Sequence, residues 1–364
     1  MAYNCEILAD SINQQGDRIT TMKITFPRMM LAELNTHRMF SRNSASSRAI
    51  PFKKMVKMVE ENPFIPIAWQ KSHSGMQGTE YFTEKEDIYR KEQIWRDARR
   101  RAVDVAKDLH SSEVTKQLCN RLLEPFMWHT VIVSATEFSN FFKLRCPEYV
   151  IEDSVNSNQS FRSKKDLLKV FKDADEAYVT TEDWLQINQS QADIHIQAIA
   201  ELMWDAMNKS TPKELKDGEW HIPFGDNINE IDILSMVDNF NVADNLYGES
   251  TQAKWIEEYK IKIAIARCAR ISYQTLGDNP KIDYEADIKL HDMLLTSGHF
   301  SPFEHVARAM SDEEYDSYFQ GRSYVNQNGP NYEKENEYWS KNGKGWCRNF
   351  KGFIQYRSLV DNKS

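Results

Sequence analysis

One stretch of the sequence, residues 35–51, concentrates groups that bind anions. It reads NTHRMFSRNSASSRAIP. Its cationic or imidazole side chains are His37, Arg38, Arg42 and Arg48, and its hydroxyls are Thr36, Ser41, Ser44, Ser46 and Ser47. Guanidinium groups match phosphate oxygens with paired N–H donors, and hydroxyls beside small residues complete an anion nest. The stretch therefore predicts a site for a phosphate-bearing ligand; a solvated basic loop is the alternative.

Composition narrows the class of protein. The 364 residues are 41% hydrophobic and 27% charged, which is typical of a soluble globular protein with a large core. The net charge of -8 disfavours nonspecific binding to nucleic acid or to an anionic membrane. No apolar run is long enough to span a bilayer, and the first residues lack the pattern of a signal peptide. We expect a cytoplasmic protein (host cytoplasm if phage-encoded).

Motifs of several familiar chemistries are missing. The sequence has neither GxGxxG after a strand nor GxxxxGK[ST], and neither HExxH nor GxSxG. The five cysteines are scattered without a CxxC pair, which indicates a reduced protein. His299 and His305 are the one histidine pair at metal spacing, and Glu304 is the one carboxylate near them. No metal site is predicted.

Hydrophobic periodicity predicts the elements that position the basic stretch. Alternation over 19–26 indicates a strand, and Pro27 then begins a helical pattern that leads into the basic stretch. Residues 84–122 read as one or two long amphipathic helices, and residues 192–207 and 253–274 as further helices.

The other segments are less regular in pattern. Residues 124–145 fit a buried helix or a strand, with helix favoured from Ala135 on. A helix should stop at Gly298, before a turn at Pro302. Residues 349–360 read as a short helix or strand. Three polar segments read as insertions or peripheral loops: 146–190, 208–250 and 311–345.

Three motifs together resemble the flavin-dependent thymidylate synthases (the ThyX type). Residues 36–48, T-H-R-x-x-S-x-N-x-x-S-x-R, match the family signature R-H-R-x-x-S-x-N-x-x-S-x-R except at its first position. Residues 299–305, HFSPFEH, match the family's H-x-S/T-P-F-E-H turn. The third element is R-x-x-x-P at 121–125 followed by N-F-x-x-L-R at 140–145.

The order of these motifs is unusual, because short family members have the SPFEH turn before the arginine signature. The chain resembles longer, largely phage-encoded relatives that look circularly permuted. The resemblance covers 20–51, 112–145, 191–207 and 262–310. It implies an α+β fold: a single catalytic domain over 1–364, in which long helices flank an antiparallel sheet. We expect that sheet to carry the strands before Pro27 and around His305.

The resemblance also implies an activity, cofactors and an assembly. The family methylates dUMP to dTMP with methylenetetrahydrofolate, FAD as redox cofactor and NADPH as electron donor. It forms homotetramers whose sites are shared between subunits. The residues implied to bind FAD are His37, Arg38, Ser41, Asn43, Asn140 and His305. Those implied to bind the nucleotide are Glu33, Ser46, Ser47, Arg48, Arg121 and Arg145.

Arg145 and His305 are the implied catalytic residues. A fixed guanidinium such as that of Arg145 can stabilise charge that develops on a pyrimidine ring without titrating. A flavin supplies hydride, so no cysteine nucleophile is required.

Some residues depart from the family pattern and leave alternatives open. Thr36 replaces the first arginine of the signature, and Glu33 stands where glutamine is usual. A carboxylate accepts hydrogen bonds only, which favours amino groups on the ligand. Three alternatives therefore remain. The substrate could be another pyrimidine nucleotide such as dCMP, the product could carry a hydroxymethyl group, or the protein could bind a nucleotide without catalysis. Two further predictions are that His195 is structural and that Arg357, in the last helix or strand, either returns to the site or only packs.

Overall fold

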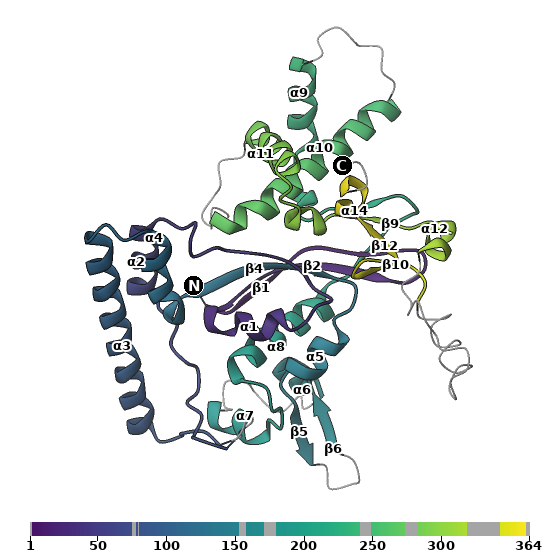
Figure 1. Ribbon diagram of the computed structural model, residues 1–364. Helices are drawn as coiled ribbons and strands as arrows, with labels where there is room; N and C mark the ends of the chain where they lie inside the picture. The colour runs from purple at the N-terminus through teal and green to yellow at the C-terminus, as the bar shows by residue number, and fades with distance from the viewer. Residues whose placement is uncertain are drawn as a thin grey trace, which may run out of the picture.

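The computed structural model describes residues 2–74, 78, 80–152, 158–170, 180–240, 249–273, 283–318 and 343–361. Helices cover both faces of a central, largely antiparallel sheet (Figure 1). The predicted α+β class is confirmed.

The central sheet has five strands in the order β3-β4-β2-β1-β7. Their bounds are β1 Asn4–Ile12, β2 Arg18–Pro27, β3 Ser41–Ser44, β4 Trp128–Ala135 and β7 Lys213–Glu214. β2 is the strand predicted over 19–26, and β4 resolves the choice between helix and strand in favour of a strand. β4 is buried throughout, and its β-branched sequence WHTVIVSA suits a central strand.

The two faces of the central sheet differ in polarity because successive side chains alternate between them. On β2, Met22, Ile24 and Phe26 belong to one apolar cluster, whereas Thr21 and Thr25 point the other way. The strand pairing continues the polar face onto the neighbouring strands through Ser41, Asn43, Thr130 and Ser134. We call this second face the hydroxyl face.

Three helices and a 3-10 turn pack on or beside the apolar face. They are η1 Arg28–Met30, α1 Leu31–Asn35, α5 Ser139–Arg145 and α8 Ile194–Lys209. Ile196, Ile199 and Met203 of α8 are fully buried against the sheet. The helices predicted after Pro27, after Ala135 and over 192–207 are thereby confirmed.

The hydroxyl face is covered by α10 Glu249–Arg270, by η5 Ile271–Tyr273 and by η6 Ser301–Glu304. Cys268 and Ile271 pack on Ile132 of β4. A further helix, α11 Tyr284–Thr296, packs on α10, and both lie above the sheet in Figure 1. Gly298, with φ +73°, follows the end of α11 as predicted.

A second, three-stranded sheet has the order β12-β9-β8. Its strands are β8 Trp220–His221, β9 Ala307–Ala309 and β12 Phe353–Gln355. Ile19 of β2 shares an apolar cluster with Ala307 and Phe353, so the two segments predicted to meet do lie together.

Two predictions about this region are wrong. The strand after His305 is not in the central sheet, because β8 and β12 occupy both edges of β9. The segment 208–250 is not peripheral over 213–221, because β7 pairs with β1 and β8 pairs with β9.

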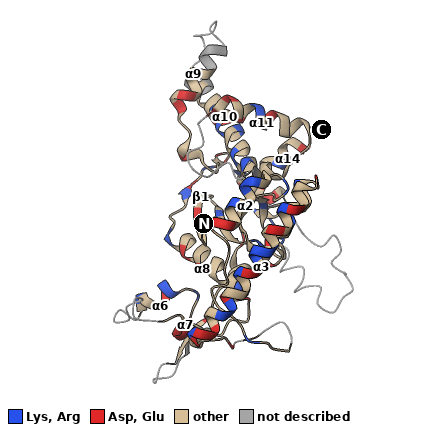
Figure 2. Ribbon diagram, turned by 90° about the vertical axis from the view of Figure 1, so that its left-hand side faces the viewer, with Lys and Arg blue, Asp and Glu red and all other residues tan. Residues whose placement is uncertain are grey.

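At one end of the central sheet lie α2 Phe52–Glu61, α3 Lys85–Ser111, α4 Lys116–Cys119 and η2 Asn120–Phe126. α3 is the long helix expected within 84–122. Both Lys or Arg and Asp or Glu occur along it (Figure 2), with pairs such as Arg96–Glu92.

Further elements lie in the described part of the chain. They are β5 Tyr149–Glu152, β6 Asn158–Phe161, α6 Lys164–Val170, α7 Thr181–Ile187, η4 Gly225–Asn227, α9 Glu230–Phe240, α12 Asp312–Ser317, β10 Trp346–Cys347, β11 Phe350–Lys351 and α14 Tyr356–Asp361. Segment 146–190 thus contains regular elements, whereas most of 311–345 lies outside the described residues. Among the described helices, none combines the length and apolarity needed to cross a bilayer.

Candidate functional site

The turn at residues 46–50 is held in place by Asn120, at the start of η2. The Asn120 side chain is fully buried, and its Nδ2 donates to the carbonyls of Ser47 (2.7 Å) and Ile50 (2.9 Å). The Ser46 N–H donates to the carbonyl of Ser272 (3.1 Å). Buried carbonyls need donors, so Asn120 fixes the backbone that carries Arg48.

Three exposed cations lie on the segments that meet here: Arg48, Lys116 and Arg121. Arg121 directly follows Asn120, and the Lys116 Nζ donates to the carbonyl of Ala49 (3.3 Å). Within the described ranges, no carboxylate forms an ion pair with Arg48 or Arg121. The two arginines predicted to bind phosphate thus lie on segments joined by Asn120, and Lys116, which the sequence analysis missed, contacts the same turn.

Glu124 shares η2 with Arg121 but is engaged elsewhere. Its Oε1 accepts a hydrogen bond from the Ser47 Oγ (2.5 Å) and lies 3.6 Å from the Arg28 Nη2. Arg28 also contacts the Nε2 of His129 (3.1 Å), and burial lowers the pKa of His129 to about 3. The predicted substrate residue Ser47 therefore already has a protein partner, and Arg28 compensates the charge of Glu124.

A second group of predicted site residues centres on His37, which precedes β3, and on Arg145, the last residue of α5. The Arg145 Nε donates to the His37 Nε2 (3.1 Å), and its Nη2 donates to the Thr36 Oγ1 (3.3 Å). Burial first, and then the charge of Arg145, lowers the pKa of His37 to about 4. A neutral His37 accepts from Arg145, so the imidazole orients the guanidinium. Thr36, the departure from the family signature, supplies the second acceptor.

Three other predicted residues lie near this second group along the chain. Arg38 and Asn140 are exposed, so both side chains are available to a ligand. Glu33 is half-buried, and its Oε2 is buried without a hydrogen-bond partner among the described residues. The Thr36 Oγ1 donates to the backbone carbonyl of Glu33 (2.7 Å), which places Glu33 beside the Arg145 contact.

Ser41 and Asn43 lie on the hydroxyl face and bond to other parts of the chain. The Ser41 Oγ accepts from Asn349 (3.1 Å) and Gln355 (3.2 Å). The Asn43 Nδ2 donates to the carbonyl of Cys268 (2.5 Å), and its Oδ1 accepts from Ser301 (3.3 Å). Both residues are at most 7% exposed, so their side chains bond within this chain and are not accessible to a cofactor.

The end of the chain does return to this region. Besides the contacts of Asn349 and Gln355, Arg357 forms an ion pair with Glu304 in the 299–305 turn. The last segment therefore packs on Ser41 and on the 299–305 turn, and whether it serves the site stays a prediction.

His305 is fully buried, so no part of its side chain is exposed in this chain. Its Nδ1 is 2.8 Å from the Ser134 Oγ, and its Nε2 has no partner among the described residues. Burial, and secondly the nearby His221, lowers the pKa of His305 to about 3, so the ring is neutral at pH 7.

His195 has the structural role that was predicted. Its Nδ1 is bonded to Asp193 (2.8 Å), and its Nε2 accepts from the backbone N–H of Ile67 (3.3 Å). In the described part of the chain, no group of three His, Cys, Asp or Glu residues is arranged to hold a metal ion.

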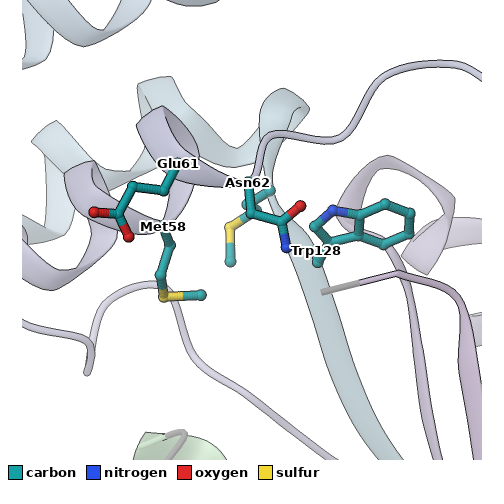
Figure 3. Close-up of a pocket in the computed structure, with 5 residues that line it drawn as sticks. Met58, Glu61, Asn62 and Trp128 are labelled. Carbon is teal, nitrogen blue, oxygen red and sulfur yellow. The ribbon is translucent and has the colours of Figure 1, made fainter.

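A small cavity of about 140 Å³ lies away from the predicted residues (Figure 3). It is lined by Met58, Glu61, Asn62, Met127 and Trp128. In Figure 3 the Met58 and Trp128 side chains lie on either side of Asn62. None of the predicted cofactor or nucleotide ligands lines this cavity, so it does not enter the candidate site.

Comparison with known proteins gives distant matches. No protein-family model and no curated protein matches the chain. Two crystal structures of the UMP/dUMP methylase PolB from Streptomyces cacaoi are similar to it. The structure bound with 5-Br dUMP has 16% identity and a TM-score of 0.35, over 53% of this chain and 66% of that chain. The structure bound with 5-Br UMP has 14% identity and a TM-score of 0.37, over 57% and 89%. At these scores neither match supports a functional argument.

Proposed function

We propose that the chain is a flavin-dependent thymidylate synthase that methylates dUMP to dTMP with methylenetetrahydrofolate, FAD and NADPH. The observation that supports the proposal is that Arg48 and Arg121 are both exposed and lie on segments that Asn120 joins by hydrogen bonds. These are the two arginines that the family resemblance assigns to the nucleotide phosphate. We further propose a cytoplasmic homotetramer with sites shared between subunits.

The phosphate site consists of Arg48, Arg121 and Lys116, together with Ser46 in the turn. The two guanidinium groups can each donate paired hydrogen bonds to phosphate oxygens, and the ammonium adds a point charge. Glu124 does not compete for these cations, because Arg28 and Ser47 hold its carboxylate.

Arg145 is the proposed electrostatic catalyst. Methylation at C5 of uracil requires negative charge to build up on the ring oxygens or N3. A guanidinium held by His37 and Thr36 is preorganised to stabilise that charge, which saves reorganisation during the reaction. His37 acts as a positioning residue in this scheme.

The residues available for FAD are fewer than the family pattern implies. Arg38 and Asn140 are exposed and fit a dinucleotide, since a guanidinium matches a pyrophosphate and an amide matches polar ring atoms. When bound, the flavin supplies hydride. Within this chain, Ser41 and Asn43 hold β3, the strand between the His37 group and the 46–50 turn. His305 lies on the buried hydroxyl face, where it bonds to Ser134.

One observation favours a second candidate, a flavin and folate enzyme that acts on dCMP. The Glu33 Oε2 is a buried acceptor without a partner in the described residues. An unpaired buried acceptor is costly, and the amino group of cytosine is a donor that would satisfy it.

Two measurements test the proposal. The purified protein should show flavin absorbance in the visible range; a colourless protein that takes up no added FAD would leave only nucleotide binding. Product analysis with dUMP and with dCMP, in the presence of methylenetetrahydrofolate and NADPH, then separates the two enzymatic candidates and identifies a methyl or hydroxymethyl product.

Substitutions of Arg48 and of Arg145 should cause different defects, one in nucleotide binding and the other in turnover. Arg48→Ala should weaken nucleotide binding roughly tenfold to hundredfold, since a charge-assisted hydrogen bond contributes about 1.5–3 kcal/mol. Arg145→Ala should instead abolish turnover while the flavin stays bound. The checks are nucleotide titration and single-turnover flavin oxidation. The exposed Lys53→Ala on α2 is the matched control. If Arg48→Ala leaves nucleotide affinity unchanged, the 46–50 turn is a structural loop.

A further inference from the structure

Five side chains form a continuous hydrogen-bonded chain between the two sheets. In order they are Ser11, His221, Thr21, Ser134 and His305. The four links are Ser11 Oγ to His221 Nδ1 (2.9 Å), His221 Nε2 to Thr21 Oγ1 (2.8 Å), Thr21 Oγ1 to Ser134 Oγ (2.6 Å) and Ser134 Oγ to His305 Nδ1 (2.8 Å). All four distances are those of well-formed hydrogen bonds.

The chain is isolated from solvent and both rings are neutral. Ser11 is 4% exposed, and the other four residues are fully buried. Burial lowers the pKa of His221 and of His305 to about 3. Each ring therefore carries a single hydrogen at pH 7, either on Nδ1 or on Nε2.

Every link has one hydrogen and one acceptor only when the two rings carry their hydrogens on the same ring position. If His221 carries its hydrogen on Nε2, the hydroxyls of Thr21 and Ser134 both point towards His305, which then carries its own on Nε2. If His221 carries its hydrogen on Nδ1, each hydrogen bond runs in the opposite direction. Ser134 then donates to Thr21, Thr21 donates to His221, and His305 carries its hydrogen on Nδ1. Passage from the first arrangement to the second takes up one proton at the Ser11 Oγ and releases one from the His305 Nε2, so protons balance.

Unmatched arrangements are unfavourable. If both rings accept from the hydroxyls, no hydrogen lies between two oxygens that are 2.6 Å apart. If both rings donate, one buried hydroxyl hydrogen has no acceptor within the chain. An unpaired buried polar group costs about 1–3 kcal/mol.

We propose that His221 is a positioning residue for His305: acting through Thr21 and Ser134, it determines whether the Nε2 of His305 presents an N–H or a lone pair. That Nε2 is the open end of the chain, since no described residue bonds to it. The proposal concerns groups within the protein and does not depend on the proposed reaction. In that reaction it fixes the hydrogen-bonding character of a residue that the family resemblance places at the site.

The segment 213–221 holds His221 in place through its strand pairing. β7 and β8 anchor this segment on β1 and β9, and the second of the two β8 residues is His221. Thr21 and Ser134 face each other across the β2–β4 pair, which holds the middle link in register.

The test is ¹⁵N NMR of histidine-labelled protein, in which the ring nitrogens of the two tautomers have distinct chemical shifts. His221→Gln and His305→Gln assign the signals. In the unsubstituted protein both rings should be neutral at pH 7 and carry their hydrogen on the same ring position. Opposite tautomers at His221 and His305 would overturn the proposal.

A substitution then breaks the middle of the chain. In Thr21→Val, which keeps side-chain volume but removes both donor and acceptor, His305 should change from a single tautomer to a measurable mixture. The matched control is Thr25→Val on the same strand, because Thr25 bonds to Thr130 (3.1 Å) outside the chain. Ser134→Ala breaks the next link and replaces Thr21→Val if that variant does not fold. A His305 tautomer that is unchanged in the folded link variant contradicts the proposal.

Discussion

Residues of the basic stretch differ in role according to whether they lie within β3 or beside it. Ser41 and Asn43 point to the hydroxyl face, where they bond to distant segments. Arg38 and Arg48 flank the strand and are exposed. The motif therefore contains both the proposed ligands and the residues that fix their support, which its sequence pattern alone does not distinguish.

The most sensitive single residue at the phosphate site should be Asn120. Asn120→Asp replaces a donor to two buried carbonyls with a carboxylate that only accepts, so it should lower the free energy of unfolding by about 3 kcal/mol or more. Urea unfolding measures the change. Asn208→Asp, the same substitution at an exposed position of α8, should alter it by no more than about 0.5 kcal/mol. Equal effects of the two variants would show that Asn120 does not hold the turn.

At the scale of elements, two glycines with the same φ should respond differently to alanine. Gly298 has φ +73° and open space where a Cβ would lie, so Gly298→Ala should cost only about 1 kcal/mol of backbone strain. Gly352 also has φ +73°, but a Cβ there would approach Asn13 and Asp17 to less than 3 Å. Gly352→Ala should therefore be the more destabilising variant by thermal or urea unfolding. The reverse order would mean that the β12 end is loosely packed.

Long elements could be predicted from sequence, and contacts between short ones could not. β2, α3, α8 and α10 repeat their apolar period often enough to be recognised. β7, β8 and β9 contain two or three residues each, too few for any period. These strands exist because they pair with partners far along the chain.

The same limit applies to the candidate site. Arg48 was predictable because guanidinium groups beside small residues indicate anion binding, whereas Arg121 was assigned only by the family resemblance. The role of His221 was not, since its partners Ser11 and Thr21 are 210 and 200 residues away. The acceptor that Thr36 offers to Arg145 likewise depends on a contact across 109 residues.

At the scale of the whole molecule, buried neutral histidines should make stability depend on pH. Burial lowers the pKa of His129 to about 3, as it does for His221 and His305. Between the unfolded pKa near 6.5 and that lower value, only the unfolded chain binds the proton, so stability falls as pH falls. Each such histidine should cost about 1.4 kcal/mol between pH 7.5 and 5.5.

Comparison of variants separates the loss of stability caused by a buried histidine from the loss caused by protonation of carboxylates. His129→Gln keeps an acceptor for Arg28 but cannot titrate, so its loss of stability between pH 7.5 and 5.5 should be smaller by about 1.4 kcal/mol. His73→Gln, at an exposed position, serves as the control and should lose as much as the unsubstituted protein. The measurement is urea unfolding at both pH values, and an unchanged difference in His129→Gln would contradict the prediction.

The bonds from Asn349 and Gln355 to Ser41 have a consequence for synthesis on the ribosome. Asn349 and Gln355 are separated from Ser41 by 308 and 314 residues, and the backbone N–H of Lys351 donates to the Thr136 Oγ1 (2.9 Å). At about 5–20 residues per second, Ser41 waits roughly 15–60 s for translation to deliver them. During that interval the basic stretch lacks its final support and is open to chaperones and proteases. A premature stop codon a few residues before Asn349 would leave the nascent chain in that state permanently.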